Sequence, residues 1–227
     1  RFLIPTFYFS TYFFAPLIFI LTFLSIYYIS LITFSQIDLK KLIAYSSVSH
    51  MGFVTIALFT YNIQGIEGSL FLMLSHGIVS SLLFFLIGML YDRYKTRILF
   101  FYSSLNSFMP LFCFCFFIAT LANVGFPGTS SFIGEFLIMI SFFSFNKVAF
   151  IVNSLSFFVT AVYGFLLYNR ISFGSVFREY RFSDLTKREF FVVIPLIILI
   201  FFFGVFPNIC LTLFEFQLFN FIILLPK

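Results

Sequence analysis

The sequence predicts an all-α membrane protein with about six transmembrane helices, one of them broken. A soluble domain carries about 25% charged residues, whereas this chain of 227 residues is 9% charged and 62% hydrophobic. Its apolar residues gather in segments long enough to cross a bilayer, and the basic residues between them sort mainly to one side. This sorting assigns the net charge of +5 to membrane orientation rather than to a nucleic-acid partner.

A helix needs about 20 mostly apolar residues to cross a bilayer core of roughly 30 Å. Six segments meet this requirement, at residues 12–35, 42–61, 68–91, 108–146, 148–169 and 189–206. The last follows "TKRE" (186–189), which resembles a capping box that opens a helix. The apolar tail at 208–225 is expected to form a terminal helix at the membrane interface or along a neighbouring helix. With no internal repeat or low-complexity linker, residues 1–227 are expected to form a single transmembrane unit.

The segment at 108–146 is too long for one straight crossing and contains "NVGFPGTSSFIGEF". Gly125, Pro127 and Gly128 should interrupt the helix, because proline removes a hydrogen-bond donor and clashes with the preceding turn. The alternative is a loop that joins two separate spans. Because each half would be short for a full crossing, a broken helix is the favoured prediction.

The lysines and arginines fall mainly on one side of the predicted membrane. Ten of the thirteen lie in the loops after the first, third and fifth spans: Lys40, Lys41, Arg93, Lys95, Arg97, Arg170, Arg178, Arg181, Lys187 and Arg188. The opposite side has Lys147 and the terminal Arg1 and Lys227. The positive-inside rule places the basic loops on the cytoplasmic or matrix side and both termini on the opposite side.

Three ionisable side chains lie near the middle of predicted spans: His50, His76 and Glu135. At a rise of about 1.5 Å per residue, His50 lies roughly 13 Å from the basic side, and His76 and Glu135 lie about 12 Å and 18 Å from the other side. Because a charge at the bilayer centre is costly, these residues should face the protein interior or water. Each histidine on its own suits a packing role, but three such residues on three spans beside a helix break favour proton transfer.

Hydroxyl side chains share helical faces with the three ionisable residues: Ser46 and Ser47 with His50, Ser80 with His76, and Ser131 with Glu135. At spacings of three or four residues these hydroxyls can hold water or a proton. The break at 125–128 would also free backbone groups beside Glu135, as in the ion sites of membrane transporters. Lys40 and Lys41 serve as orientation charges and are candidates to bias a proton path electrostatically.

Three stretches of the chain carry a resemblance to a known family. They read "QIDLKKLIAYSSVSHMGFV", "NIQGIEGSLFLMLSHGIVSSLLFFLIGMLYDRYKTR" and "LANVGFPGTSSFIGEFLIMI". They closely resemble the NADH-ubiquinone oxidoreductase chain 4 family, antiporter-like membrane subunits of respiratory complex I. The resemblance implies that Glu135 is the family's broken-helix glutamate, where related subunits usually have lysine. It also implies that His50 and His76 are the two histidines of the family's central hydrophilic axis. They would relay protons along the axis to Glu135, which would accept them toward the intermembrane side.

The same resemblance implies that this chain is the C-terminal part of an antiporter-like subunit, in the mitochondrial inner membrane. The family's N-terminal membrane glutamate and two axis lysines lie upstream of the region that matches Arg1. We therefore expect a separate N-terminal fragment of the subunit as a partner, or a longer chain of which this is a part. No basic and apolar leader follows Arg1. Further expected partners are the neighbouring antiporter-like subunits, chains 2 and 5, other complex I subunits, and membrane lipids, with cardiolipin as a candidate.

The sequence assigns no redox cofactor to this chain. It has no glycine fingerprint for a dinucleotide and no cysteine cluster for iron–sulfur ligation, so NADH, FMN, iron–sulfur clusters and ubiquinone are expected elsewhere in the complex. Cys113, Cys115 and Cys210 suit core packing rather than a metal or a disulfide framework. No catalytic redox residues are expected, and the subunit would contribute proton transport to an NADH:ubiquinone reductase.

Two other functions are consistent with the sequence. The family resemblance extends to multisubunit cation/proton antiporters, whose transport would depend on sodium. A fragment without transport that holds the membrane arm together is the second alternative.

Overall fold

The computed structural model of the chain describes residues 3–174 and 183–214. Its helices are α1 (Leu3–Thr6), α2 (Tyr8–Ser35), α3 (Leu39–Leu58), α4 (Ile63–Tyr94), the 3₁₀ turn η1 (Leu99–Phe101), α5 (Leu105–Phe108), α6 (Pro110–Val124), α7 (Ser130–Phe145), α8 (Lys147–Ser172) and α9 (Lys187–Val205). An all-helical membrane protein with one broken helix is confirmed, since α6 and α7 divide the segment expected at 108–146. Of the terminal helix expected at 208–225, residues 208–214 are helical and the rest lies outside the described residues.

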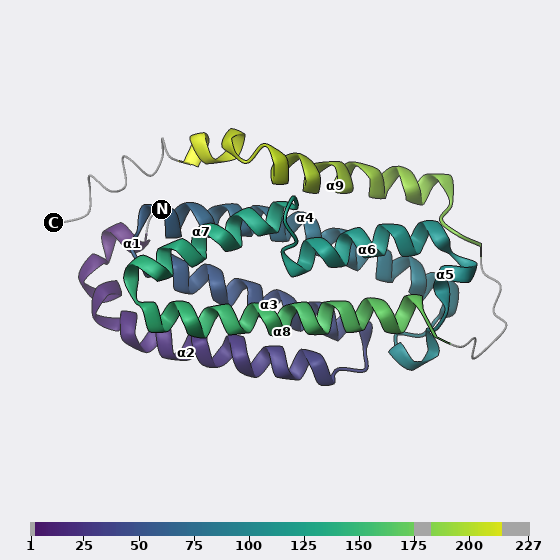
Figure 1. The fold of residues 1–227 in the computed structure, drawn as a ribbon, viewed down its shortest axis with the longest axis horizontal. Coiled ribbons are helices and arrows are strands. Elements are labelled where there is room, and N and C mark those ends of the chain that lie inside the picture. Colours follow the sequence, from purple (N-terminus) through teal and green to yellow (C-terminus); the bar gives the residue numbers. More distant parts are fainter. Residues whose placement is uncertain (1–2, 175–182, 215–227) are drawn as a thin grey trace.

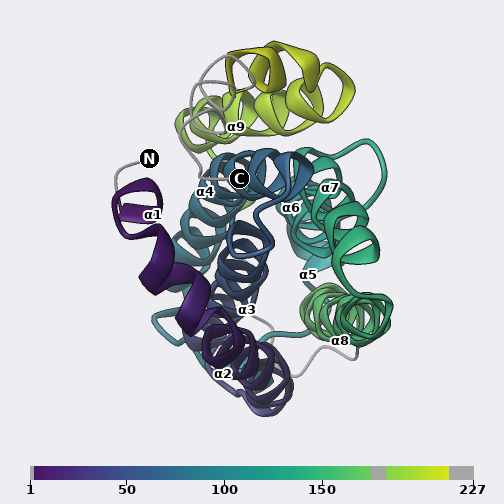
Figure 2. The same ribbon diagram turned by 90° about the vertical axis from the view of Figure 1, so that its left-hand side faces the viewer.

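The helices run roughly parallel to the long axis of the molecule and form two layers, which α9 covers on one side (Figure 1). Viewed end-on, α2, α3 and α4 form one layer, and α8 with the collinear α6 and α7 forms the other (Figure 2). α9 lies across the top of both layers, above α4, α6 and α7. α3 is therefore the helix most enclosed by others, and its side chains fill much of the interior.

α3 begins earlier than the sequence predicts. Asp38 forms an isolated bridge with Ile98, and the backbone N–H of Leu39 donates to the carbonyl of Arg97, which follows α4, at 3.0 Å. These bonds fix the start of the helix at Leu39 rather than at residue 42. Lys40 and Lys41 consequently lie in the first turn of α3, not in the loop before it.

α4 also begins earlier than predicted, at Ile63 rather than at residue 68. Its 32 residues span about 48 Å, which is longer than a bilayer core. Glu67 therefore lies inside α4 and is buried, although its sequence position suggested the end of a span.

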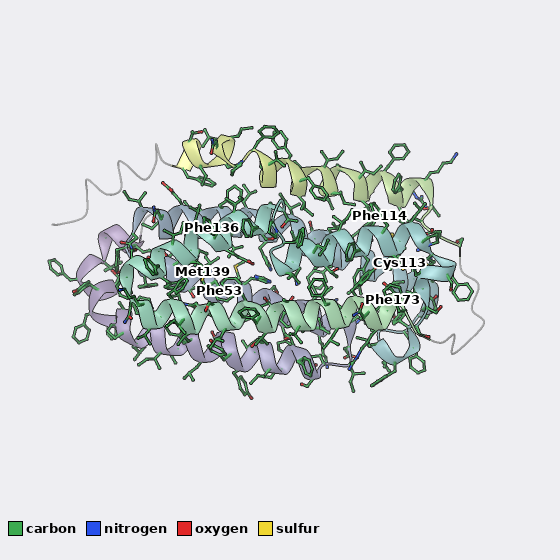
Figure 3. All side chains as sticks on the ribbon, in the orientation of Figure 1. Phe53, Cys113, Phe114, Phe136, Met139 and Phe173 are labelled. Carbon is green, nitrogen blue, oxygen red and sulfur yellow. The ribbon has the colours of Figure 1, made fainter. Side chains whose placement is uncertain are left out.

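The outer surface is apolar, as expected for a multi-pass membrane protein. Phe114 and Phe136 are more than half exposed, whereas Phe53 is fully buried and stacks on Phe157 at 4.6 Å (Figure 3). Within the described residues, α2 (from Phe9), α4, α8 and α9 are long and apolar enough to cross a membrane individually. α3 is more polar than these helices, and its polar side chains are tolerated because the neighbouring helices shield them from lipid.

The basic residues gather at one end of the bundle. The turn between α2 and α3, the segment around α5, and the chain leading into α9 all lie at the right-hand end of Figure 1, whereas α1 and the turn between α7 and α8 lie at the other end. The described basic residues at the right-hand end are Lys40, Lys41, Arg93, Lys95, Arg97, Arg170, Lys187 and Arg188, and Lys147 lies at the opposite end. We call the right-hand end the basic end.

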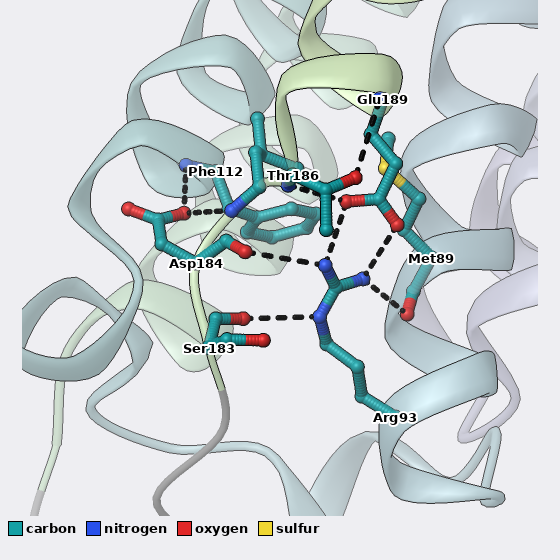
Figure 4. Close-up of polar contacts among 8 residues, drawn as sticks. Met89, Arg93, Phe112, Ser183, Asp184, Thr186 and Glu189 are labelled. Atoms are coloured by element: carbon teal, nitrogen blue, oxygen red, sulfur yellow. Dashed lines mark hydrogen bonds and ion pairs between the residues drawn. The ribbon is translucent and has the colours of Figure 1, made fainter.

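Arg93, near the C-terminus of α4, holds the start of α9. Its guanidinium donates to both carboxylate oxygens of Glu189, at 2.7 and 3.1 Å, and to the backbone carbonyls of Ser183 and Asp184 (Figure 4). Glu189 and Thr186 form the predicted capping box. A bidentate pair of this kind is stronger than neutral hydrogen bonds, so α9 is fixed to α4.

Asp184 caps α6 from a distant part of the sequence. Its carboxylate accepts hydrogen bonds from the backbone N–H groups of Leu111 and Phe112, at 2.9 and 3.1 Å (Figure 4). The residue that precedes α6, Met109, gives no side-chain cap. A carboxylate at a helix N-terminus satisfies free donors and interacts favourably with the helix dipole. Asp184, three residues before α9, thus positions the first half of the broken helix.

Candidate functional site

Three ionisable side chains from three helices meet inside the bundle. Nδ1 of His50, on α3, lies 3.6 Å from Oε1 of Glu135, on α7. The ring centroids of His50 and His76, which lies on α4, are 5.6 Å apart. His50 and Glu135 are 2% and 6% exposed, and His76 is half-buried. The structure thus brings together the three residues that the sequence singled out, and we call them the central cluster.

The helix break makes room for the Glu135 carboxylate. α6 ends at Gly125, whose φ of +76° lies in the left-handed region that glycine adopts without steric cost. The N–H of Gly125 donates back to the carbonyl of Ala122, as at many helix ends closed by glycine. A Cβ at position 125 would overlap the Glu135 carboxylate. The residue that ends α6 therefore also forms the wall of the acidic site.

Ser131 joins the two halves of the broken helix. Its hydroxyl donates to the carbonyl of Ala122, at the end of α6, and lies 3.3 Å from the hydroxyl of Thr129. The sequence predicted free backbone groups beside Glu135. The Ala122 carbonyl is occupied by the N–H of Gly125 and the hydroxyl of Ser131, whereas the backbone and the side chain of Asn123 both face His50.

A close approach between α7 and α4 sets the depth of Glu135. A Cβ on Gly134 would lie 2.9 Å from the backbone nitrogen and the Cβ of Leu72. Small residues let membrane helices pack backbone to backbone in this way. Because Gly134 directly precedes Glu135, and Leu72 lies one turn before His76, this contact holds two members of the central cluster in register.

Several polar atoms of this region are buried without an ordinary hydrogen bond to any described residue. They are both ring nitrogens of His50, Oε1 of Glu135 and the hydroxyl of Tyr163, on α8. Buried polar groups in proteins almost always bond to protein or to ordered water. Donors and acceptors gathered this closely are suited to bind water between them.

Tyr163 and Asn123 belong to the site although the sequence did not single them out. Tyr163 is 2% exposed, and its hydroxyl lies beside those of Ser46 and Ser49 and within electrostatic reach of Glu135. Asn123 faces His50 from the end of α6. The polar Asn123, two residues before the break, was a usable signal. Tyr163 was not, because the chain has 12 tyrosines and nothing local sets this one apart.

The serines and lysines predicted to support the site have partners of their own outside the central cluster or lie away from it. Three serines donate to carbonyls of their own helices: Ser46 to Ile43, Ser47 to Ala44 and Ser80 to Gly77. Lys41 pairs with Asp38 at 3.3 Å on the exposed surface. Lys40, also exposed, lies ten residues before His50 on α3, a rise of about 15 Å. Neither lysine is part of the central cluster.

Comparison with known proteins identifies relatives of the chain. The family model of the NADH:quinone oxidoreductase/Mrp antiporter transmembrane region matches residues 1–162. A protein from Chondrus crispus named NADH-ubiquinone oxidoreductase chain 4 is 54% identical over 210 residues, which cover 92% of this chain and 43% of the relative. The protein of the same name from Acanthamoeba castellanii is 57% identical over 194 residues, or 85% and 39% of the two chains. The chain thus spans about two fifths of the length of the curated relatives it matches.

Solved structures show the same fold. A chain of respiratory complex I from Thermus thermophilus with bound NADH superposes with a TM-score of 0.85 at 29% identity, over 91% of this chain and 44% of that one. A chain of the Mrp complex from Dietzia sp. superposes with a TM-score of 0.80 at 16% identity, over 87% and 45% of the two chains. The second likeness concerns the fold alone.

Proposed function

The chain belongs to the NADH:quinone oxidoreductase/Mrp antiporter transmembrane family, and on that premise we propose that it is the C-terminal part of a proton-translocating subunit of NADH:ubiquinone oxidoreductase. The relatives named NADH-ubiquinone oxidoreductase chain 4 support the choice of complex. The observation that carries the transport role is the contact of His50 with both Glu135 and His76 inside an apolar bundle.

Proton transfer follows from the chemistry of the central cluster. A proton on His50 places a positive charge 3.6 Å from the Glu135 carboxylate, which stabilises the charged pair at a depth where single charges are costly. Transfer of that proton to Glu135 leaves two neutral groups. His76 adjoins His50 and supplies the next proton. The three residues are therefore a relay, with Glu135 as the acceptor toward the side away from the basic end.

The remaining parts of the proposal concern the surroundings of the chain. We place it in the mitochondrial inner membrane, with the basic end on the matrix side. The energy comes from quinone reduction elsewhere, and NADH, FMN, the iron–sulfur clusters and ubiquinone are assigned to other subunits. Chains 2 and 5, other subunits of the complex, and lipids such as cardiolipin are the proposed neighbours.

An N-terminal part of the subunit is the proposed direct partner. The curated relatives are more than twice as long as the matched region. One face of α4 is open in the structure: Met73 is 39% exposed, and a Cβ on Gly77 or Gly88 would meet nothing within 4 Å. Small residues beside the half-buried His76 suit a packed helix better than acyl chains. We place the N-terminal part on this face.

Replacement of Glu135 by glutamine tests the function. Glutamine keeps the shape of the side chain but cannot carry the proton, so proton pumping should fall by about tenfold or more, as positioned proton-transfer groups contribute at least that much to rates. The measurement is proton pumping and quinone-linked NADH oxidation in sealed membrane vesicles that contain the assembled complex. A Glu67→Gln variant is the control, since Glu67 is a buried carboxyl of α4 outside the central cluster.

Two results would redirect the proposal. Unchanged pumping in the Glu135→Gln complex would leave a structural fragment without transport as the better function. Transport that requires sodium would favour a cation/proton antiporter, a function that the family description also includes.

A further inference from the structure

Two adjoining cavities lie near the basic end, an outer one beside the end of α8 and an inner one between α2 and α8. The outer one, of about 480 Å³, is lined by η1 and the end of α8, including Phe100, Asn169 and Arg170. The inner one, of about 20 Å³, shares Leu99 and Arg170 with it and is also lined by Thr33, Gln36 and Tyr163. The inner cavity is large enough for a water molecule, and the hydroxyl of Thr33 and the amide of Gln36 supply polar partners.

Tyr163 lies at the inner end of this route. Seven residues separate it from Arg170 on α8, a rise of about 10 Å. Its ring belongs to the apolar core with Leu42 and Leu167, and its hydroxyl is buried without an ordinary hydrogen bond to a described residue. The hydroxyls of Ser49 and Ser46 neighbour that hydroxyl, and Glu135 acts on it electrostatically. Tyr163 therefore lines the inner cavity and also neighbours the central cluster.

We propose that Tyr163 and the inner cavity form a branch along which protons pass between the basic end and the His50–Glu135 pair. The proposal deepens the proton-transport function stated above and rests on it. Arg170 is exposed on the rim, where water and salt screen its charge. Inside the rim the narrow cavity admits water but excludes hydrated metal cations, so it would select protons by size.

The transfer step conserves protons. The Tyr163 hydroxyl accepts a proton from a water molecule in the inner cavity on its oxygen while its own proton moves to the Glu135 carboxylate, directly or through the hydroxyls of Ser46 and Ser49. The O–H bond that breaks on Tyr163 is replaced by the one that forms, and rotation of the hydroxyl resets it. The water that gave up its proton takes up another from the aqueous phase at the basic end, so the net change is one proton moved from that side to Glu135, and no redox partner is needed.

Replacement of Tyr163 by phenylalanine tests the branch in the assembled complex. Phenylalanine keeps the ring in the core and removes only the hydroxyl, so proton pumping should fall by about fivefold or more while the amount of complex stays the same. Tyr168→Phe is the matched control: it lies on the same helix, and its ring packs on Phe117 at 4.9 Å, outside the cluster. Thr33→Val, which removes a hydroxyl from the inner cavity without changing its shape, is a second variant and should lower pumping as well.

A further readout separates transfer from packing. If the branch supplies protons from the basic end, a lower pH on that side should partly restore pumping in Tyr163→Phe but not in Glu135→Gln. Normal pumping in both Tyr163→Phe and Thr33→Val, with pumping lost in Glu135→Gln, would overturn the branch and leave the proposed function intact. Normal pumping in Glu135→Gln as well would overturn both.

Discussion

Glu135 keeps its place in the interior because Gly125 has no side chain. The φ of +76° at Gly125 allows α6 to end within one turn, and the missing Cβ leaves the space that the carboxylate occupies. A glycine is usually required either for a positive φ or for a close approach, not for both. Gly125 meets both requirements: it ends α6 and it leaves space for the Glu135 carboxylate.

Gly125→Ala should impair proton pumping more than assembly. Alanine in the left-handed region costs about 1–2 kcal/mol, and its Cβ must displace the Glu135 carboxylate from His50. Gly128→Ala is the matched control, since Gly128 has a φ of +94° but a Cβ there would meet nothing within 4 Å. The measurement is protons pumped per NADH oxidised, together with the amount of assembled complex. Equal defects in the two variants would mean that backbone strain alone matters.

At the scale of the helices, local signals predicted the fold well. The glycines and proline at 125–128 marked the break, and "TKRE" marked the start of α9, because helix ends are decided by a few adjacent residues. The contacts that position the site are long-range. Asp184 caps α6 across 72 residues of sequence, and Arg93 binds Glu189 across 96. Tyr163 reaches the cluster from another helix in the same way, and only packing could reveal it.

Arg93→Lys should loosen the start of α9. Lysine keeps the charge but cannot donate in parallel to both oxygens of Glu189 and to two carbonyls, so the first turn of α9 should lose about 2 kcal/mol of local stability. At about 1.4 kcal/mol per factor of ten, amide hydrogen exchange in that turn should accelerate roughly 30-fold. The measurement is hydrogen exchange of the assembled complex followed by mass spectrometry.

Arg188→Lys provides the comparison for this helix. It makes the same chemical change one residue from Glu189, at an exposed position. Exchange in α9 should stay within about twofold of the parent, as is usual for surface changes. If amide hydrogen exchange in α9 were equally fast in Arg93→Lys and Arg188→Lys, the bidentate pair of Arg93 with Glu189 would not be the interaction that fixes α9.

At the scale of the whole molecule, the surface has two kinds of apolar face. α2, α8 and α9 present large side chains outward, such as Leu155 at 55% exposed and Ile198 at 58%. The open face of α4 instead carries Met73, Gly77, Ser81 and Gly88. Large side chains suit acyl chains, whereas small ones allow another helix to approach closely. The distribution of side-chain size therefore distinguishes the surface suited to lipid from the α4 face on which we propose that the rest of the subunit docks.

Gly77→Trp should prevent the N-terminal part of the subunit from docking. Position 77 has open space in this chain, so tryptophan is accommodated here, but it would fill the gap that a partner helix needs. Leu155→Trp, on the lipid-facing surface of α8, is the control and should be tolerated. The measurement is the amount of assembled complex in isolated membranes, with recovery of the N-terminal part alongside an affinity-tagged chain where the two are separate. A wedge that costs even 1.4 kcal/mol of docking energy lowers association about tenfold, so Gly77→Trp should lower recovery by at least that factor. Equal recovery of the two variants would mean that the α4 face meets lipid, and that the central cluster works without a partner on that side.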